Sequence, residues 1–275
     1  MFMDPGRSRW DLNFRLLGVS VRVHPMFWLV SLLLGQGALH LGIGFLLVWV
    51  ACLFLSILIH EMGHVLAARA FGVDGEIVLY SFGGLAIPAS HMHSRWQHII
   101  VCFGGPLAGF LLLGAVVLCL PALAPEEIPH LKNAILYQLN LAPLDRDLIG
   151  LPSLRREVIN DLVWINLVWG LVNLLPIWPL DGGQVSRDVF TMILPRNGGS
   201  IALGISLVCA SVIALHAVMG MNGMRLLPTW FPLRGDLWLV LMFGYLAVGS
   251  FMALQEEQSR SKWTDEHWSR WDDER

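Results

Sequence analysis

Long apolar stretches recur along the 275-residue chain, and shorter polar stretches separate them. Six apolar stretches can be recognised, at about 25–39, 39–71, 97–120, 158–175, 201–220 and 236–254. A helix needs about 20 mostly apolar residues to cross a bilayer. The pattern therefore predicts an all-α polytopic membrane protein with about six transmembrane helices. The first stretch is short for a full crossing and contains Gly35, Gln36 and Gly37, so a re-entrant segment is an alternative for it.

Composition supports a membrane protein over a soluble one. The chain is 55% hydrophobic and 14% charged, whereas soluble domains carry about 25% charged residues. The formal net charge of −3 is too small to indicate a nucleic-acid partner. The cysteines lie inside apolar stretches and none forms a C-x-x-C pair, which favours buried thiols over a redox or metal motif: Cys52, Cys102, Cys119 and Cys209.

The distribution of Lys and Arg predicts an orientation. If all six stretches cross, the segments on the same side as the two termini carry 12 basic residues, and the segments on the other side carry 6. Because cytoplasmic loops are the richer in Lys and Arg, both termini are expected in the cytoplasm, and the second helix should run from outside to inside. We also expect a protein of a bacterial inner membrane. Its parts would be an N-terminal cytoplasmic segment (1–24), a membrane core (25–254) and a cytoplasmic tail (255–275) that forms a solvated or surface-lying helix.

An H-E-x-x-H motif, formed by His60, Glu61 and His64, lies near the end of the second apolar stretch. On a helix, residues i and i+4 lie on nearly the same face, so both imidazoles can bind one zinc ion (Zn²⁺). Glu61 is then close enough to take a proton from the attacking water. Ionisable groups inside a membrane helix cost roughly 2.5–3.5 kcal/mol each, which favours a function for them. The alternative is a polar cluster that reaches the interface together with Arg69.

A catalytic zinc ion of this kind needs a third protein ligand, and Asp181 is the best candidate. It follows the apolar run 166–180 and precedes Gly182-Gly183, and two prolines interrupt that run. Proline ends or bends a helix, so one carboxylate would lie at a broken helix end at the cytoplasmic side. An ordinary turn at Leu-Asp-Gly-Gly is the alternative explanation. Other acids remain as rival ligands: Asp74, Asp161, Asp188 and Asp236.

Together these motifs resemble the site-2 proteases, which are zinc endopeptidases that cut within membranes. The resemblance covers about 18–185 and includes HEMGH, NLLPIWPLDGG, VRVHP, YSFGGLA and GGPLAG. It implies that His60, His64 and Asp181 bind zinc, that Glu61 is the catalytic base, and that Asn173 holds the substrate or the oxyanion. The chain resembles the membrane core of the family without PDZ or CBS domains. The implied partners are the lipid bilayer and a transmembrane protein substrate, and the process is regulated intramembrane proteolysis.

A small membrane-associated β-hairpin is expected after the second helix, within 73–90. Apolar residues alternate there, and Gly83-Gly84 permit a tight turn or a close backbone approach. A sheet edge at Gly83, Gly84 and Leu85 could bind an unwound substrate as an added strand. A simple cytoplasmic loop is the alternative. A nearby group of histidines, His91, His93 and His98, is more typical of a solvated loop than of a metal site.

Two other functions remain possible from the residues. A metal-dependent membrane lipid enzyme would have an apolar helical scaffold, but di-iron lipid enzymes need further histidine clusters such as H-x-x-H-H. An inactive homologue could bind membrane proteins without cutting them, although the complete H-E-x-x-H motif and Asp181 argue against it. Metal content separates the three: one zinc ion favours a protease, two iron ions favour a lipid enzyme, and no metal favours an inactive homologue.

Overall fold

The computed structural model describes residues 6–81, 83–90, 92–143, 153–228, 231–233 and 235–273, with 260–273 described by their backbone alone. They form two compact units, Met1–Val172 with Thr229–Pro232 and Asn173–Pro228 with Leu233–Arg275. The first unit begins with β1 (Leu12–Leu16), β2 (Val19–Val23), α1 (Pro25–Leu34), the 3₁₀ helix η1 (Gln36–Leu41), α2 (Ile43–Ala70), β3 (Gly75–Tyr80) and β4 (Gly83–Pro88). It continues with α3 (Arg95–Leu123), the 3₁₀ helix η2 (Pro125–Glu127), α4 (Ile128–Gln138), α6 (Leu154–Val163) and the π-helix η3 (Trp164–Trp169). After α7 (Gly170–Asn173), the second unit contains α8 (Asp181–Ile193), α9 (Gly198–Met221) and α10 (Leu237–Asp273).

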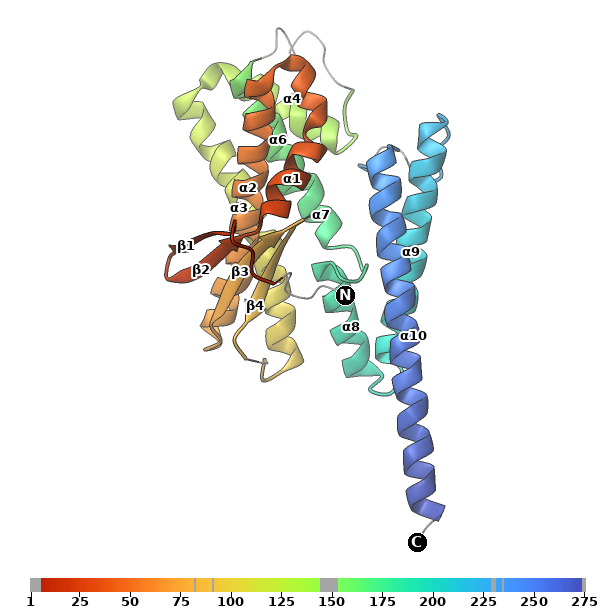
Figure 1. Cartoon of the computed structure of the whole chain (residues 1–275). Helices are drawn as coiled ribbons and strands as arrows, with labels where there is room; N and C mark the ends of the chain where they lie inside the picture. The colour runs from red at the N-terminus through yellow and green to blue at the C-terminus, as the bar shows by residue number, and fades with distance from the viewer. Residues whose placement is uncertain are drawn as a thin grey trace. The chain divides into compact units, whose positions relative to one another are not determined.

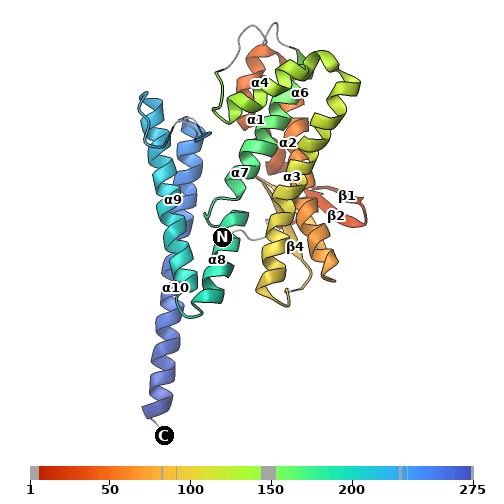
Figure 2. The ribbon, with the colours of Figure 1, turned by 180° about the vertical axis from the view of Figure 1, so that it is seen from behind.

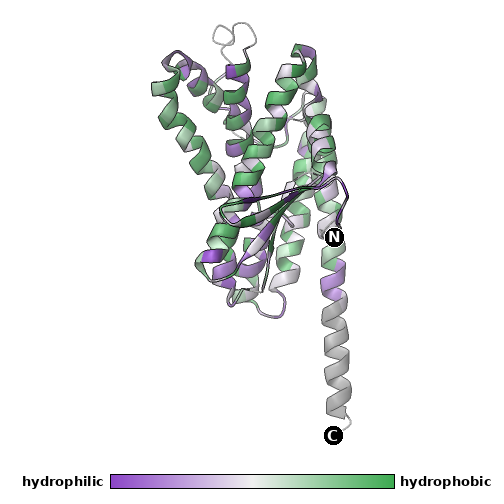
Figure 3. Ribbon diagram, turned by 60° about the vertical axis from the view of Figure 1, so that its left-hand side comes forward, coloured by the Kyte–Doolittle hydropathy of each residue, from purple (hydrophilic) through white to green (hydrophobic). Residues whose placement is uncertain are grey.

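Four helices of the described residues are long and apolar enough to cross a membrane: α2, α3, α9 and the part of α10 at Leu237–Ser259. The protein is thus a multi-pass membrane protein, but six crossings are not confirmed. The first predicted stretch gives α1, which has 10 residues and rises only about 15 Å, half of the roughly 30 Å hydrocarbon thickness. The fourth stretch is divided among α6, η3 and α7. Figure 3 shows the apolar part of α10 giving way to hydrophilic residues further along the helix.

A four-stranded sheet of order β1-β2-β3-β4 lies beside the C-terminal half of α2 (Figure 1). The predicted hairpin after the second helix is confirmed, because β3 and β4 pair antiparallel with Tyr80 opposite Gly83. The prediction of a lone hairpin was incomplete, since β2 pairs parallel to β3 and antiparallel to β1. Leu17 and Gly18 join β1 to β2 and both have positive φ, 51° and 75°, as a two-residue type I′ turn requires.

Alternating residues of β2 and β3 pack the sheet against α2. Val19, Val21 and Val23 are at most 2% exposed, and Ile77 and Leu79 are fully buried. These side chains form one core cluster with apolar residues of α2. The period of two places every second side chain on the same face. The sheet is thereby fixed against the helix that carries the H-E-x-x-H motif.

Two amphipathic helices lie where the sequence predicted only connecting segments. In α4, the spacing of Leu131 and Ala134 places both on a buried face that packs against residues of α3 and α6. In α8, Asp181 occupies the first turn, where the helix dipole favours a carboxylate. Both helices are shorter than a membrane span, with 11 and 13 residues. A search for long apolar stretches therefore misses them.

Candidate metal centre

The structure places the three polar residues of the H-E-x-x-H motif together on α2. Among the described residues, His60, Glu61 and His64 are the one group of three potential ligands, and their ligand atoms all lie within 4.8 Å of one another. Glu61 and His64 are buried, at 6% and 8% exposure. The predicted local geometry, with both imidazoles on one helix face, is confirmed.

The orientation of His64 suits metal binding. Its Nδ1 lies 2.7 Å from the carbonyl oxygen of Val101 on α3. An N–H donated to that carbonyl fixes the tautomer, so the lone pair of Nε2 is left for a metal ion. The two Nε2 atoms of His60 and His64 are 3.1 Å apart. Two nitrogen ligands about 2.0–2.1 Å from one tetrahedral zinc ion lie roughly 3.3 Å apart. The donor set and its spacing therefore fit zinc.

Helix α3 approaches this cluster through glycines of the GGPLAG motif. An added Cβ on Gly63 would lie 2.2 Å from the carbonyl oxygen of Gly104, so the two backbones touch where α2 and α3 cross. The next residue, Gly105, faces the histidines: its Cβ would lie 2.2 Å from Nε2 of His64 and 2.7 Å from Nε2 of His60. Small residues allow such close helix approaches in membranes. Gly105 thus leaves open the space in front of both ligand nitrogens.

Gly84, the second residue of β4, lies against Glu61. An added Cβ on Gly84 would stand 2.2 Å from Cγ and 2.6 Å from Oε1 of Glu61, whereas one on Gly83 would meet no atom within 4 Å. In the described sheet, β4 is an edge strand whose inner side pairs with β3. Gly84, one of the three residues predicted to bind substrate, therefore lies directly against the side chain of the predicted base.

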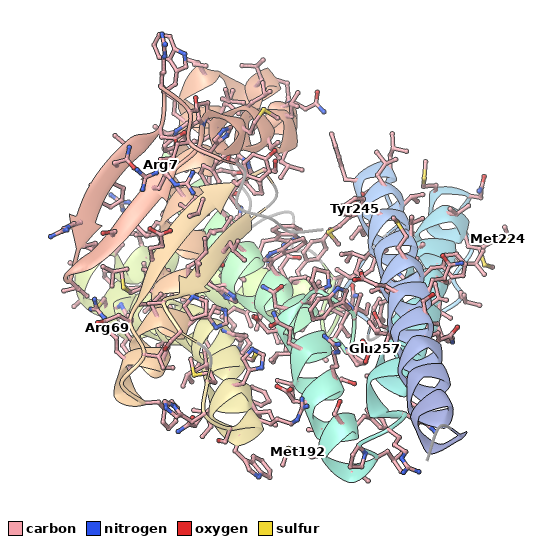
Figure 4. All side chains as sticks on the ribbon, turned by 60° about the horizontal axis from the view of Figure 1, so that its bottom comes forward. Arg7, Arg69, Met192, Met224, Tyr245 and Glu257 are labelled. Atoms are coloured by element: carbon pink, nitrogen blue, oxygen red, sulfur yellow. The ribbon has the colours of Figure 1, made fainter. Side chains whose placement is uncertain are left out.

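Arg69, at the end of α2, binds the turn between β1 and β2, in the half of the sheet away from β4. Its guanidinium donates to the carbonyl oxygens of Leu17 and Gly18 at 2.9 and 3.0 Å and to Asp74 at 3.0 Å. Figure 4 shows Arg69 beside the turn between β1 and β2. These contacts disfavour the alternative in which Arg69 belongs to an interfacial polar cluster with the histidines. Figure 2 shows α3 on the opposite side of α2 from β1 and β2.

Asp181 and Asn173 lie in the second unit, so their place at the metal site stays a prediction. Asp181 is the first residue of α8 and is 9% exposed, and Asn173 ends α7. Two rival acids have other partners: Asp74 binds Arg69, and Asp236 caps α10 by accepting from the backbone N–H of Leu239 at 2.8 Å.

The remaining rival ligands are Asp161 and Asp188, and both are described residues. Asp161 and Asp188 are buried, on α6 and α8. His91 lies outside the described residues, and His93 is exposed. Sequence reasoning missed the Val101 carbonyl and the specific role of Gly105, although the GGPLAG motif was a signal for a close helix approach.

The sequence family agrees with this geometry. The model of peptidase family M50 matches residues 48–145 and 153–215, which include the H-E-x-x-H motif and Asp181. The chain belongs to peptidase family M50. Its matched relatives include a putative zinc metalloprotease of Synechocystis sp., 29% identical over 197 residues, 70% of this chain and 43% of the relative. A zinc metalloprotease of Methanocaldococcus jannaschii is 26% identical over 229 residues, 81% of this chain and 58% of the relative. The chain thus spans about half the length of the curated relatives that it matches.

A solved structure supports the fold. A site-2 protease from Methanocaldococcus jannaschii superposes with a TM-score of 0.53 at 21% identity, covering 89% of this chain and 95% of that chain. At this identity the likeness concerns the fold alone. Membership of family M50, which the resemblance to site-2 proteases anticipated, implies zinc as the cofactor, and the His60–Glu61–His64 group has the donors for it.

Proposed function

We propose that this M50 chain is a zinc-dependent endopeptidase that cleaves transmembrane segments of membrane-protein substrates, in regulated intramembrane proteolysis. The observation that carries the proposal is the His60–Glu61–His64 group on a 28-residue apolar helix able to cross a membrane. His60, His64 and Asp181 would hold zinc. The chemistry that bound zinc supplies is Lewis-acid catalysis, with activation of water and polarisation of the scissile carbonyl.

In this proposal Glu61 moves the protons. Its carboxylate accepts a proton from the attacking water and then delivers it to the leaving nitrogen, so one residue acts as base and as acid. The carbonyl of Val101 supports catalysis indirectly, because it fixes the tautomer of His64. Asn173, from its resemblance to the family motif, would donate to the substrate or to the developing oxyanion.

The substrate backbone needs new partners before it can be cut. A transmembrane helix has its carbonyls and N–H groups already bonded, and each freed group costs several kcal/mol in hydrocarbon. The outer edge of β4 at Gly83, Gly84 and Leu85 would supply such partners by strand addition. Because Gly84 contacts Glu61, a strand added there would run past the catalytic base.

The central test uses the full chain reconstituted in lipid vesicles with a single-span test substrate. Wild-type protein should contain one zinc ion and should release two fragments cut within the apolar span. Glu61→Gln should keep its zinc, while cleavage falls by at least about 10²-fold, the lower range for loss of a general base. Cleavage that persists in Glu61→Gln would contradict the role of Glu61. A protein with two iron ions, or with no metal and no cleavage, would favour the lipid enzyme or the inactive homologue.

Strand addition has its own test in the substrate. Test peptides that carry a single backbone N-methyl group at successive positions remove one N–H each. Because successive N–H groups of a strand point to opposite sides, cleavage should fall at alternate positions, with a period of two. A loss that is uniform, or confined to the scissile bond, would contradict pairing with β4.

The proposed orientation places both termini in the cytoplasm of a bacterial cell. It rests on the excess of basic residues in the segments assigned to that side. A single cysteine near residue 140, in a variant whose native cysteines are replaced, should react with an impermeant reagent added from outside. A cysteine near residue 190 should not, and the opposite pattern would reverse the topology.

A further inference from the structure

The apolar helices α9 and α10 contain two fully buried hydroxyl groups that the proposed mechanism does not use. Ser206 is 1% exposed and Ser250 is 0% exposed. Their Oγ atoms lie 2.7 Å apart, so the pair joins the two helices. A buried polar pair in an apolar environment is costly unless every donor is bonded. Its partners therefore indicate what the pair is for.

The partners of the two serines lead to the backbone of Trp178. The N–H of Trp178 donates to Oγ of Ser206 at 2.7 Å. Oγ of Ser250 donates to the carbonyl of Leu246 at 2.8 Å and lies 3.4 Å from the carbonyl oxygen of Trp178. A consistent set of donors runs from Trp178 N–H to Ser206, from Ser206 to Ser250, and from Ser250 to Leu246. Each of the two serine hydroxyls then donates one hydrogen bond and accepts one.

The side chain of Trp178 is held as well. The guanidinium of Arg187, on α8, lies over the indole ring at 5.6 Å from its centroid. The same guanidinium donates to Glu257 of α10 at 2.9 Å, and Figure 4 shows Glu257 on the side of α10 toward α8. Trp178 is thus held through its backbone by α9 and α10 and through its ring by α8.

Trp178 stands three residues before Asp181, in the loop between α7 and α8. The first turn of α8 packs directly on this loop. An added Cβ on Gly183 would lie 2.4 Å from the carbonyl oxygen of Ile177 and 2.5 Å from the backbone nitrogen of Trp178. With so little space between the loop and the helix start, a shift of the Trp178 peptide must move the first residue of α8.

We infer that the Ser206–Ser250 pair, named here the serine clamp, is a positioning device for the carboxylate of Asp181. Ser206 and Ser250 are positioning residues that act through Trp178, and they touch neither substrate nor metal. The inference rests on the proposed role of Asp181 as a zinc ligand. It explains why these two hydroxyls are buried between two largely apolar helices.

The test measures zinc affinity of the full chain in detergent, by competition with a chelator. Ser206→Ala removes the acceptor of the Trp178 N–H and should weaken zinc binding by about 10-fold, the lower end for groups that orient metal ligands. Ser250→Ala leaves the Trp178–Ser206 bond and should have a smaller effect in the same direction. The matched control is Ser211→Ala, an exposed serine of the same helix α9, which should bind zinc as wild type does. Cobalt(II) substituted for zinc adds a spectroscopic readout, since a displaced carboxylate should change the visible spectrum of Ser206→Ala.

Asp181→Asn separates failure of this inference from failure of the proposed function. If Asp181→Asn weakens zinc binding while Ser206→Ala and Ser250→Ala match Ser211→Ala in affinity and spectrum, the serine clamp does not position Asp181. If Asp181→Asn binds zinc as wild type does, the ligand role itself is wrong. Where Ser206→Ala does not purify as a folded protein, Ser250→Ala decides by the same comparison.

Discussion

The residues assigned to zinc come from two regions that are built differently. In the first unit, His60 and His64 are one turn apart on a single helix, and backbone contacts from α3 and β4 surround them. In the second unit, Asp181 begins a helix after a loop, and Ser206 of α9, which is itself bonded to Ser250 of α10, holds that loop. The first arrangement follows from helix geometry, whereas the second depends on contacts between residues far apart in the sequence. A motif on one helix can therefore be recognised from the local sequence. A ligand at the end of a loop, in contrast, must be held in place by contacts with residues far away in the sequence.

Gly105→Ala should have the largest effect on metal binding by the helical half of the site. The added methyl group would lie 2.2 Å from Nε2 of His64, far inside the roughly 3.5–4.0 Å contact distance of carbon atoms. Overpacking of this kind costs about 1–3 kcal/mol, so zinc affinity should fall by about 5- to 150-fold. Gly114→Ala, on the same helix with no atom within 4 Å of the added group, is the matched control. Equal zinc affinity in both variants would mean that α3 does not limit the metal site.

Gly84→Ala should impair the catalytic base without loss of the metal. Its methyl group would displace Glu61, so cleavage should fall by about 10²-fold or more while zinc stays bound. Gly83→Ala adds the same group one residue earlier, where no atom lies within 4 Å, and should reduce cleavage less. A loss of zinc in Gly84→Ala, measured by mass spectrometry, would mean that β4 supports the ligands rather than the base.

Arg69→Ala should have the smallest effect. It removes three hydrogen bonds that tie α2 to the β1–β2 turn and to Asp74. Because the side chain of Arg69 is 29% exposed, screening by solvent reduces the combined contribution of these hydrogen bonds to the free energy of unfolding to about 1 kcal/mol. The melting temperature should drop by about 2–4 °C, and the KM for substrate should rise while zinc content is unchanged. Arg69→Lys keeps the charge and loses the planar fork, so full rescue by lysine would contradict a role for the carbonyl contacts.

The same contrast explains what the sequence alone could predict. The helix of His60 and His64 and the β3–β4 hairpin follow from local patterns, with periods of 3.6 and 2. Strand β2 was missed because its burial depends on pairing with β3, more than 50 residues later, and β1 was missed because it is mostly exposed and pairs with β2. Helices α4 and α8 were missed because they are too short and too amphipathic for a search based on membrane spans. The contacts of Val101, Ser206 and Ser250 have no sequence signature, since a carbonyl or a lone serine acquires its role only from tertiary packing.

The most direct test of Asp181 as the proposed third zinc ligand replaces this residue with a cysteine. Zinc-loaded Asp181→Cys should show one sulfur neighbour at about 2.3 Å in zinc K-edge X-ray absorption, the usual zinc–thiolate distance. Wild-type protein should show only nitrogen and oxygen neighbours, and so should Asp188→Cys, which replaces a buried acid about two turns further along α8. Zinc bound in Asp181→Cys without a sulfur neighbour, or a sulfur neighbour in Asp188→Cys, would contradict the assignment of Asp181 as the third ligand.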